Sequence, residues 1–297
     1  MQGHLAMLLF SALVAGSFSL GGLMANMVDP AAFTAVRMGI AAVLMGVVVA
    51  ATGGCRRRDL SGIWRFVLLG GIYSVYFVLM FEGLRTATPV STAAVFTLTP
   101  IIAAGFGWLL LRQITTPRMV FALLIGGSGA LWVIFRADPA ALLAFQVGPG
   151  ERIFFWGVVC HALYVPLTRL LNRGERPAVF TFLMLVGSAL MLTAYSWLAL
   201  RATDWTALPM IVWITLAYVA VFASAVTFFL VIYAALRLPA AKVIAYTYLT
   251  PTWVLGWEAA LGHELPLLWI AGGIALTIVA LVLLLKDEDR QGAHASG

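Results

Sequence analysis

Residues 89–100 read PVSTAAVFTLTP, and residues 239–251 read PAAKVIAYTYLTP. Both are apolar segments of small residues that open on a proline and end on Leu-Thr-Pro, about half a chain length apart. A glycine and an aromatic residue follow each segment, at Gly105-Phe106 and at Gly256-Trp257. Such self-similarity indicates an internal repeat, in which each half of the chain forms the same structural unit.

The composition places this repeat in a membrane. The 297 residues are 63% hydrophobic and 10% charged, whereas soluble domains carry roughly 25% charged residues. The apolar runs are about 20 residues long, which is the length that crosses a hydrocarbon core of roughly 30 Å as a helix. The alternating pattern of an outer-membrane β-barrel does not occur in the sequence. We therefore predict an all-α integral membrane protein.

The apolar runs predict ten transmembrane helices, at residues 5–27, 31–51, 63–84, 89–111, 118–135, 152–171, 178–199, 209–236, 239–262 and 267–285. They group into two five-helix repeats, at 1–136 and 152–285, with an extracytoplasmic linker at 137–151 and a disordered cytoplasmic tail at 286–297. Because five is odd, the two halves enter the membrane from opposite sides. Inverted repeats whose helices are interrupted near the midplane, around a central cavity, are typical of secondary transporters.

The basic residues indicate how the chain is threaded. With the N-terminus in the cytoplasm, thirteen of the eighteen Lys and Arg residues fall in cytoplasmic loops or span ends. The outer side holds Arg85, Arg136, Arg152 and Arg201. Because basic residues mark cytoplasmic loops, we predict a multi-pass protein of the cytoplasmic (inner) membrane with both termini in the cytoplasm. The net charge of +6 lies in short loops, which argues against nucleic acid as a partner.

Two prolines are predicted to bend their helices at matching depths. Pro100 and Pro251 each remove a backbone hydrogen bond and clash with the preceding turn. We interpret them as gating bends that line a substrate path, with a static kink as the alternative, since prolines are common in membrane helices.

Arg37 and His161 are the polar residues that an apolar span accommodates least easily. Arg37 lies about 9 Å from the outer end of its span, where burial costs at least about 2.5–3.5 kcal/mol, so we expect a partner, with Glu82 and Glu258 as candidates. Its role stays open between an orientation-fixing ion pair, a carbonyl cap and direct binding of a substrate carboxylate. His161 is either a hydrogen-bonded core residue or linked to proton movement. No second ligand stands at metal spacing, so we predict no metal site.

These features resemble the drug/metabolite transporter superfamily, specifically its EamA-like ten-span exporters, which include an aromatic amino acid exporter. The resemblance covers nearly the whole chain. It is carried by Gly16-Ser17, Pro30, residues 37–42, residues 87–100, Ala162-Leu163-Tyr164, residues 235–251 and His263-Glu264-Leu265. Gln113 departs from the family pattern, which usually has Glu at the end of the fourth span.

The resemblance implies a central cavity walled mainly by the third, fourth, eighth and ninth spans. The third span carries one helical stripe of aromatic and apolar residues, at Tyr73, Tyr76, Phe77, Met80 and Phe81. Such a stripe is either packing or part of a ligand site. We predict five substrate-binding residues, which are Tyr76, Thr97, Tyr164, Tyr246 and Tyr248. Tyrosines offer ring faces and hydroxyls that suit amphipathic or aromatic solutes.

The predicted function is a secondary transporter that exports small metabolites, above all aromatic and other neutral amino acids, by alternating access. Three alternatives stay open: a carrier of anionic metabolites such as nucleotide sugars or sugar phosphates, a polyspecific drug efflux carrier, and a membrane-embedded enzyme. The enzyme would need clustered His, Asp or Glu, and the four histidines are scattered. We therefore predict no enzymatic activity and no cofactor. The expected partners are the solute and membrane lipid. We expect the protein to be a monomer.

Overall fold

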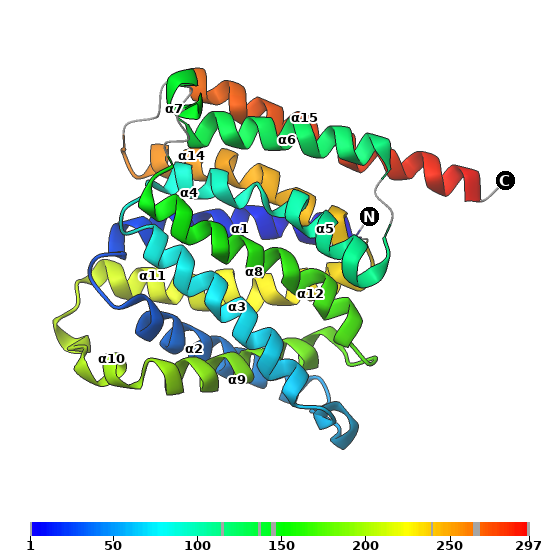
Figure 1. Cartoon of the computed structure of the whole chain (residues 1–297). Helices are drawn as coiled ribbons and strands as arrows, with labels where there is room; N and C mark the ends of the chain where they lie inside the picture. Colours follow the sequence, from blue (N-terminus) through cyan, green and yellow to red (C-terminus); the bar gives the residue numbers. More distant parts are fainter. Residues whose placement is uncertain are drawn as a thin grey trace.

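The computed structural model describes residues 2–113, 116–135, 138–143, 147–238, 240–263 and 268–295. All the secondary structure in these residues is helical (Figure 1). Eight helical segments are long and apolar enough to cross a membrane. They are α1 (Gln2–Met24), α2 (Pro30–Ala51), α3 (Trp64–Gly83), α4–α5 (Pro89–Leu111), α6 (Pro117–Ile134), α8 (Pro149–Leu171), α9 (Pro177–Tyr195) and α11–η3–α12 (Met210–Ala235). The all-helical membrane class predicted from composition is confirmed.

The predicted ninth and tenth spans also lie on helices, although neither is a single long apolar helix. The ninth consists of three short pieces, α13 (Ala240–Ala245), η4 (Tyr246–Leu249) and α14 (Thr250–Ala260). The tenth is α15 (Leu268–Ala295), whose apolar part is Trp269–Leu284. The backbone of α15 continues through residues 286–295, where the sequence predicted a disordered tail. Lys286, Glu288 and Arg290 favour helix, and no proline stops it.

Short elements complete the connections between the long helices. They are η1 (Arg57–Leu60), α7 (Pro139–Leu143), α10 (Trp197–Ala202) and η2 (Trp205–Ala207). Proline begins each of five long helices, at Pro30, Pro89, Pro117, Pro149 and Pro177. The first-turn N–H that proline lacks has no partner in a helix anyway. Asp29 strengthens one start, because its carboxylate accepts a 2.8 Å hydrogen bond from the Ala32 N–H.

The helices pack in pairs that join distant parts of the sequence. α6 lies along α15, and α2 lies along α9 (Figure 1). α3 packs on α8 and α9, while α1 packs on α11, α12 and α14. The helix pairs in closest contact therefore join the first and second halves of the chain, and the buried apolar residues form one core cluster.

Gly70 allows one of these close approaches, between α3 and α9. A Cβ atom at Gly70 would lie 2.6 Å from the Met184 carbonyl oxygen and 2.7 Å from the Ser188 nitrogen on α9. Beside it, the Ser74 and Ser188 hydroxyls form a 2.5 Å hydrogen bond. Small residues at helix interfaces allow such close backbone contact in membranes.

We expect Gly70→Ala to destabilise the protein, because the new methyl group must push backbone away from backbone. Overpacking of this kind costs about 1–3 kcal/mol. Gly39→Ala is the matched control, since a Cβ there meets nothing within 4 Å, and alanine should stabilise the helix by about 0.5–1 kcal/mol. Thermal unfolding in detergent checks both variants, and equal melting temperatures would contradict the close contact.

Candidate functional site

Two helices are interrupted immediately before the predicted bend prolines. α4 (Pro89–Phe96) ends before the break at Thr97 and Leu98, and α5 (Thr99–Leu111) holds Pro100 in its first turn. In the second half the chain tightens into the 3-10 turn η4, and Pro251 lies in the first turn of α14. Both predicted bend positions therefore coincide with a change in helical geometry.

The backbone carbonyls that the two prolines leave without an N–H partner are satisfied locally. The carbonyl of Phe96, one turn before Pro100, accepts a hydrogen bond from the Thr99 hydroxyl. The carbonyl of Thr247, one turn before Pro251, accepts the N–H of Thr250 in a 3-10 bond. Inside a membrane such replacement is required, because an unpaired backbone group there costs several kcal/mol. Each interruption is thus a built feature of its helix.

A cluster of aromatic rings lies beside the first of these breaks. It comprises Tyr73, Tyr76 and Phe77 of α3, Phe96 of α4, Phe154, His161 and Tyr164 of α8, and Phe228 of α12 (Thr227–Ala235), and we call it the aromatic cluster. The ring centres of Tyr73 and Tyr164 are 4.3 Å apart, and those of Tyr73 and Phe228 are 4.4 Å apart. The His161 ring centre lies 4.7 Å from Tyr76 and 4.9 Å from Phe96. The stripe on the third span therefore packs against aromatic residues of both halves.

The five predicted substrate-binding residues do not all meet in this cluster. Tyr76 and Tyr164 belong to it, and Thr97 lies in the break next to Phe96, with its hydroxyl donating to the Ala94 carbonyl at 2.6 Å. Tyr248 packs against Gly126 of α6, where a Cβ atom would fall 2.3 Å from the tyrosine ring.

Tyr246 lies towards the N-terminal helix instead. Its hydroxyl is 3.1 Å from His4 Nδ1. The structure therefore separates the two tyrosines of η4 from the residues of the aromatic cluster.

The centre of the bundle is closed in this conformation. The exposed fraction is 1% for Tyr76, 5% for Tyr246, and 0% for Thr97, Tyr164 and Tyr248. Among the described residues, the side chains of the aromatic cluster occupy the place where the sequence predicted a central cavity. A solute reaches these rings only if the helices around them move apart.

His161 is the polar member of the aromatic cluster. It is 1% exposed, and neither ring nitrogen has a hydrogen-bond partner among the described residues. A buried polar group left unpaired costs about 1–3 kcal/mol.

Arg37 lies one ring away from the aromatic cluster. Its guanidinium carbon is 3.7 Å from the centre of the Phe77 ring, a cation–π contact. Its Nε donates to the Ser224 hydroxyl at 2.6 Å and its Nη2 to the Ala223 carbonyl at 2.5 Å. Both acceptors belong to η3 (Val221–Val226), a π-helical turn between α11 (Met210–Ala220) and α12. Its Nη1 has no partner among the described residues.

The predicted acidic partners of Arg37 are wrong. Glu82 lies near the surface and pairs with Arg85 at 3.2 Å. The Glu258 carboxylate lies 2.8 Å from His263 Nδ1. Arg37 turns towards η3 because Ser224 and the Ala223 carbonyl of this π-turn lie within reach of its guanidinium, and π-turns occur frequently at functional sites. Of the roles considered for Arg37, the structure shows the carbonyl contact.

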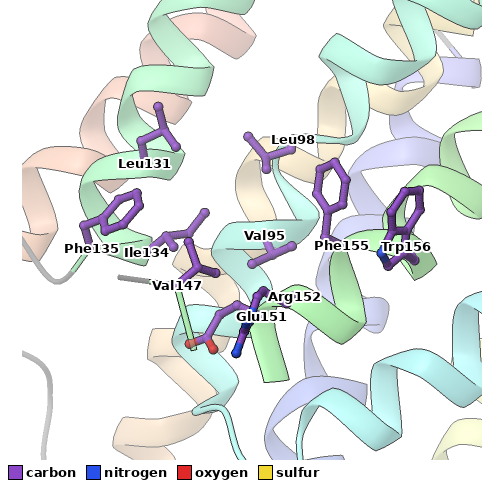
Figure 2. A pocket seen from close by; sticks show the side chains of 10 residues that line it. All are labelled: Val95, Leu98, Leu131, Ile134, Phe135, Val147, Glu151, Arg152, Phe155 and Trp156. Carbon is purple, nitrogen blue, oxygen red and sulfur yellow. The ribbon is translucent and has the colours of Figure 1, made fainter. Parts of the chain in front are cut away.

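A separate pocket opens at the edge of the bundle, between α4, α6 and α8 (Figure 2). None of its lining residues belongs to the aromatic cluster or was predicted to bind substrate. It is therefore a different feature from the closed centre.

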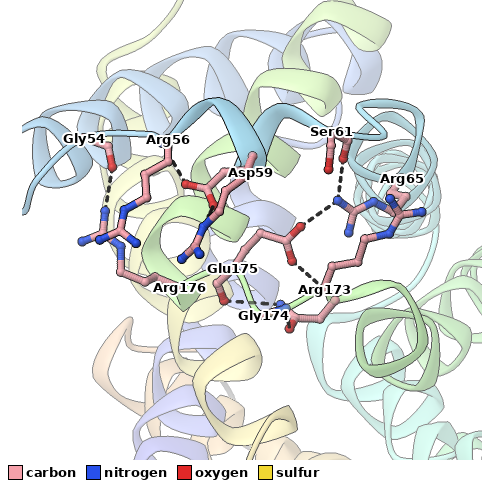
Figure 3. A network of polar contacts seen from close by, with 11 residues as sticks. Gly54, Arg56, Asp59, Ser61, Arg65, Arg173, Gly174, Glu175 and Arg176 are labelled. Atoms are coloured by element: carbon pink, nitrogen blue, oxygen red, sulfur yellow. Dashed lines mark hydrogen bonds and ion pairs between the residues drawn. The ribbon is translucent and has the colours of Figure 1, made fainter.

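A polar network that was not predicted from the sequence joins the start of α3 to the loop between α8 and α9 (Figure 3). Arg65, at the start of α3, forms a 2.7 Å ion pair with Glu175, which lies between α8 and α9. The two side chains are 0% and 3% exposed. Arg65 also donates to the carbonyls of Ser61 and Leu171. The network joins a loop of the first half to a loop of the second.

Arg176 and Arg173 extend this connection. Arg176 donates to the Thr52 carbonyl at 2.5 Å and to the Gly54 carbonyl at 2.6 Å, and the Arg173 N–H donates to Glu175 at 2.6 Å. Burial acts to raise the pKa of Glu175, but the hydrogen bonds from Arg65 and Arg173 outweigh it and hold the pKa below its usual value. Glu175 is a single acid between two arginines in sequence, and that pattern was the available signal.

Comparison of this chain with known proteins identifies its family. The sequence matches the family described as EamA-like transporter family over residues 1–135 and 149–286. A relative, the uncharacterized transporter YyaM of Bacillus subtilis (strain 168), is 26% identical over 193 residues, which are 64% of this chain and 63% of that protein. The match thus spans less than two thirds of the relative's own length.

A protein of known crystal structure has the same fold. It superimposes with a TM-score of 0.72 and 18% identity, covering 98% of this chain and 97% of that one. At this identity the likeness concerns the fold alone. Since the family match covers most of the sequence, the chain belongs to the EamA-like transporter family.

Proposed function

We propose that this protein is a ten-span secondary transporter of the cytoplasmic membrane that exports aromatic and other neutral amino acids by alternating access. The aromatic cluster carries this proposal, because it places ring faces, an imidazole and a nearby guanidinium at the junction of both halves. No chemical step is required of the protein, which in this proposal acts as a monomer and not as an enzyme.

The helix contacts support two inverted repeats. If each helix of the first half is exchanged for its counterpart five spans later, the pattern of neighbours is preserved. In this exchange α3 corresponds to the α11–α12 segment, and α8 corresponds to α1. The contact of α3 with α8 therefore corresponds to the contact of α11–α12 with α1, and both contacts occur. α2 corresponds to α9, and α6 corresponds to α15, so these two contacts are each formed between a helix and its own counterpart. With cytoplasmic termini, the network of Arg65 and Glu175 lies on the cytoplasmic side.

The chemistry of the site favours a zwitterionic solute with an apolar side chain. The rings of Tyr73, Tyr76 and Phe96 can stack on an aromatic or apolar group. The Nη1 of Arg37, which has no partner in the part of the chain that the structure describes, can donate to a carboxylate in a charge-assisted bond. His161 can accept from or donate to the polar end. The resemblance to an aromatic amino acid exporter, YddG, favours the same class of solute.

An anionic metabolite is the second candidate, and its support is a further buried cation, Lys242 of α13. The helix of Lys242 packs on α5 and α8, whereas Arg37 contacts η3, so the two cations lie against different elements. Recognition of a phosphate group calls for cations that converge on one point, so we place this candidate second.

Uptake into liposomes tests the proposal. Purified protein is expected to move radiolabelled phenylalanine, tryptophan, tyrosine, leucine or methionine above the level of empty vesicles. A sugar phosphate and a nucleotide sugar serve as the competing panel. Movement of the anionic panel alone would replace the proposal with the second candidate, and movement of neither would overturn both.

Tyr76→Leu is expected to weaken phenylalanine transport by roughly 2- to 12-fold, because one aromatic contact contributes about 0.5–1.5 kcal/mol. Tyr248→Leu is the matched control, since Tyr248 faces α6, away from the aromatic cluster. The concentration for half-maximal uptake measures both. A larger loss in Tyr248→Leu than in Tyr76→Leu would place the substrate at η4 instead.

A further inference from the structure

The pocket at the edge of the bundle has a volume of about 350 Å³. Its walls are Val95 and Leu98 on the α4–α5 segment, Leu131 and Phe135 on α6, and Phe155 and Trp156 on α8 (Figure 2). This volume lies within the range of about 300–1,000 Å³ for small-molecule sites. The walls alone would suit any apolar chain.

One end of the pocket is charged. Glu151 and Arg152, in the first turn of α8, lie together at one end of the lining, away from Leu131 and Leu98 (Figure 2). Glu151 is buried, and its Oε1 accepts a 2.6 Å hydrogen bond from the Ser91 hydroxyl. No cation forms an ion pair with Glu151 among the described residues. Because a buried carboxylate without a positive partner is costly, this end of the pocket calls for a cationic group.

The pocket opens to the outer surface of the helix bundle. Trp156, Phe155 and Leu131 are exposed apolar side chains on helices long enough to span a membrane. Trp156 lies one turn from Arg152, as expected of an aromatic residue at the interface between headgroups and hydrocarbon. The pocket is therefore polar at the level of the headgroups and apolar below it, which matches the polarity of a phospholipid.

We propose that this pocket binds a phospholipid with a primary ammonium headgroup, that is, a phosphatidylethanolamine. Its ammonium donates to Glu151, its phosphate accepts from Arg152, and part of one acyl chain lies between α4, α6 and α8. Both signs of charge on the protein are then matched by one zwitterionic headgroup. An anionic lipid would leave Glu151 without a cation, and a choline headgroup has no N–H to donate.

Such a lipid would contact the helix break described above. Val95 precedes the break between α4 and α5, and Leu98 lies in it. The bound chain would therefore touch the segment at which we propose that the first half bends. Binding itself does not depend on what the protein transports.

Native mass spectrometry of the detergent-purified protein tests the proposal with three probes, which are phosphatidylethanolamine, phosphatidylcholine and phosphatidylglycerol of the same acyl chains. We expect the ethanolamine lipid to be retained roughly tenfold better than the other two, as for a charge-assisted hydrogen bond. Glu151→Gln should abolish this preference, and Arg152→Gln should reduce the retention of all three lipids. Arg201→Gln, on α10, is the control and should change nothing.

Leu131→Trp provides an independent check, because the larger side chain fills the apolar part of the pocket from its exposed wall. It should reduce retention of all three lipids while leaving the melting temperature unchanged. Equal retention of the three lipids by the wild type would overturn the proposal, as would a preference that survives Glu151→Gln. Dimers that form on delipidation and vanish in Leu131→Trp would assign the pocket to a second copy instead.

Discussion

Glu175→Gln is expected to lower the free energy of unfolding by about 3–5 kcal/mol, the cost of breaking a buried ion pair by removing one partner. The substitution leaves the Arg65 guanidinium, which is 0% exposed, without its carboxylate. The exposed pair of Arg85 and Glu82, with side chains 45% and 39% exposed, is the matched control. Glu82→Gln should cost less than about 1 kcal/mol. Unfolding in detergent, followed by tryptophan fluorescence, measures both.

The double variant Arg65→Met with Glu175→Leu should lose less stability than Glu175→Gln alone, because no unpaired charge remains. The pair also predicts a pH dependence. Since the pKa of Glu175 is lowered on folding, its contribution is complete above its unfolded pKa of about 4.3. It is lost as the pH falls through the lower folded pKa. Similar losses in Glu175→Gln and Glu82→Gln would show that the pair does not hold the two loops together.

Arg37→Met is expected to lower phenylalanine uptake by roughly 10- to 100-fold, because a hydrogen bond to a charged group contributes about 1.5–3 kcal/mol. The same variant should not lower the melting temperature. It removes a fully buried cation that has no acidic partner among the described residues, and the cost of keeping that charge out of water disappears with it.

Two further variants separate transport from folding at this position. Arg37→Lys keeps the charge and should retain part of the uptake, although it loses the planar guanidinium. Ser224→Ala removes only the hydroxyl that accepts from Nε, so its effect on uptake should be small. If Arg37→Met instead melts as early as Glu175→Gln and transports normally per folded molecule, Arg37 serves only to stabilise η3.

The helical class and the two helix breaks could be predicted from the sequence, because they depend on local chemistry. Runs of about 20 apolar residues form helices in a membrane regardless of their neighbours. Proline within an apolar span removes a backbone hydrogen bond, and Pro100 and Pro251 mark positions at which the helical geometry does change, whereas α8 continues through Pro166. The aromatic stripe of the third span was visible for the same reason.

Side-chain partners could not be predicted, because they depend on packing between distant segments. Arg37 reaches Ser224 across 187 positions in sequence, and the π-turn that presents Ser224 has no distinctive composition. Tyr248 lies only two residues from Tyr246, yet it turns to α6 because Gly126 leaves room for its ring. Glu175 was visible as a single acid among arginines, but its burial by α3 was not.

Side-specific labelling of a cysteine in the closed centre tests whether the aromatic cluster opens to solvent. Thr97→Cys would be placed in a background in which Cys55 and Cys160 are serine, in vesicles of known orientation treated with a membrane-impermeant maleimide. If the centre opens to each side in turn, the cysteine reacts from either side of the membrane, and phenylalanine slows both reactions. Reaction from neither side would contradict this opening, because the aromatic cluster would then be a permanent core and not a site that opens.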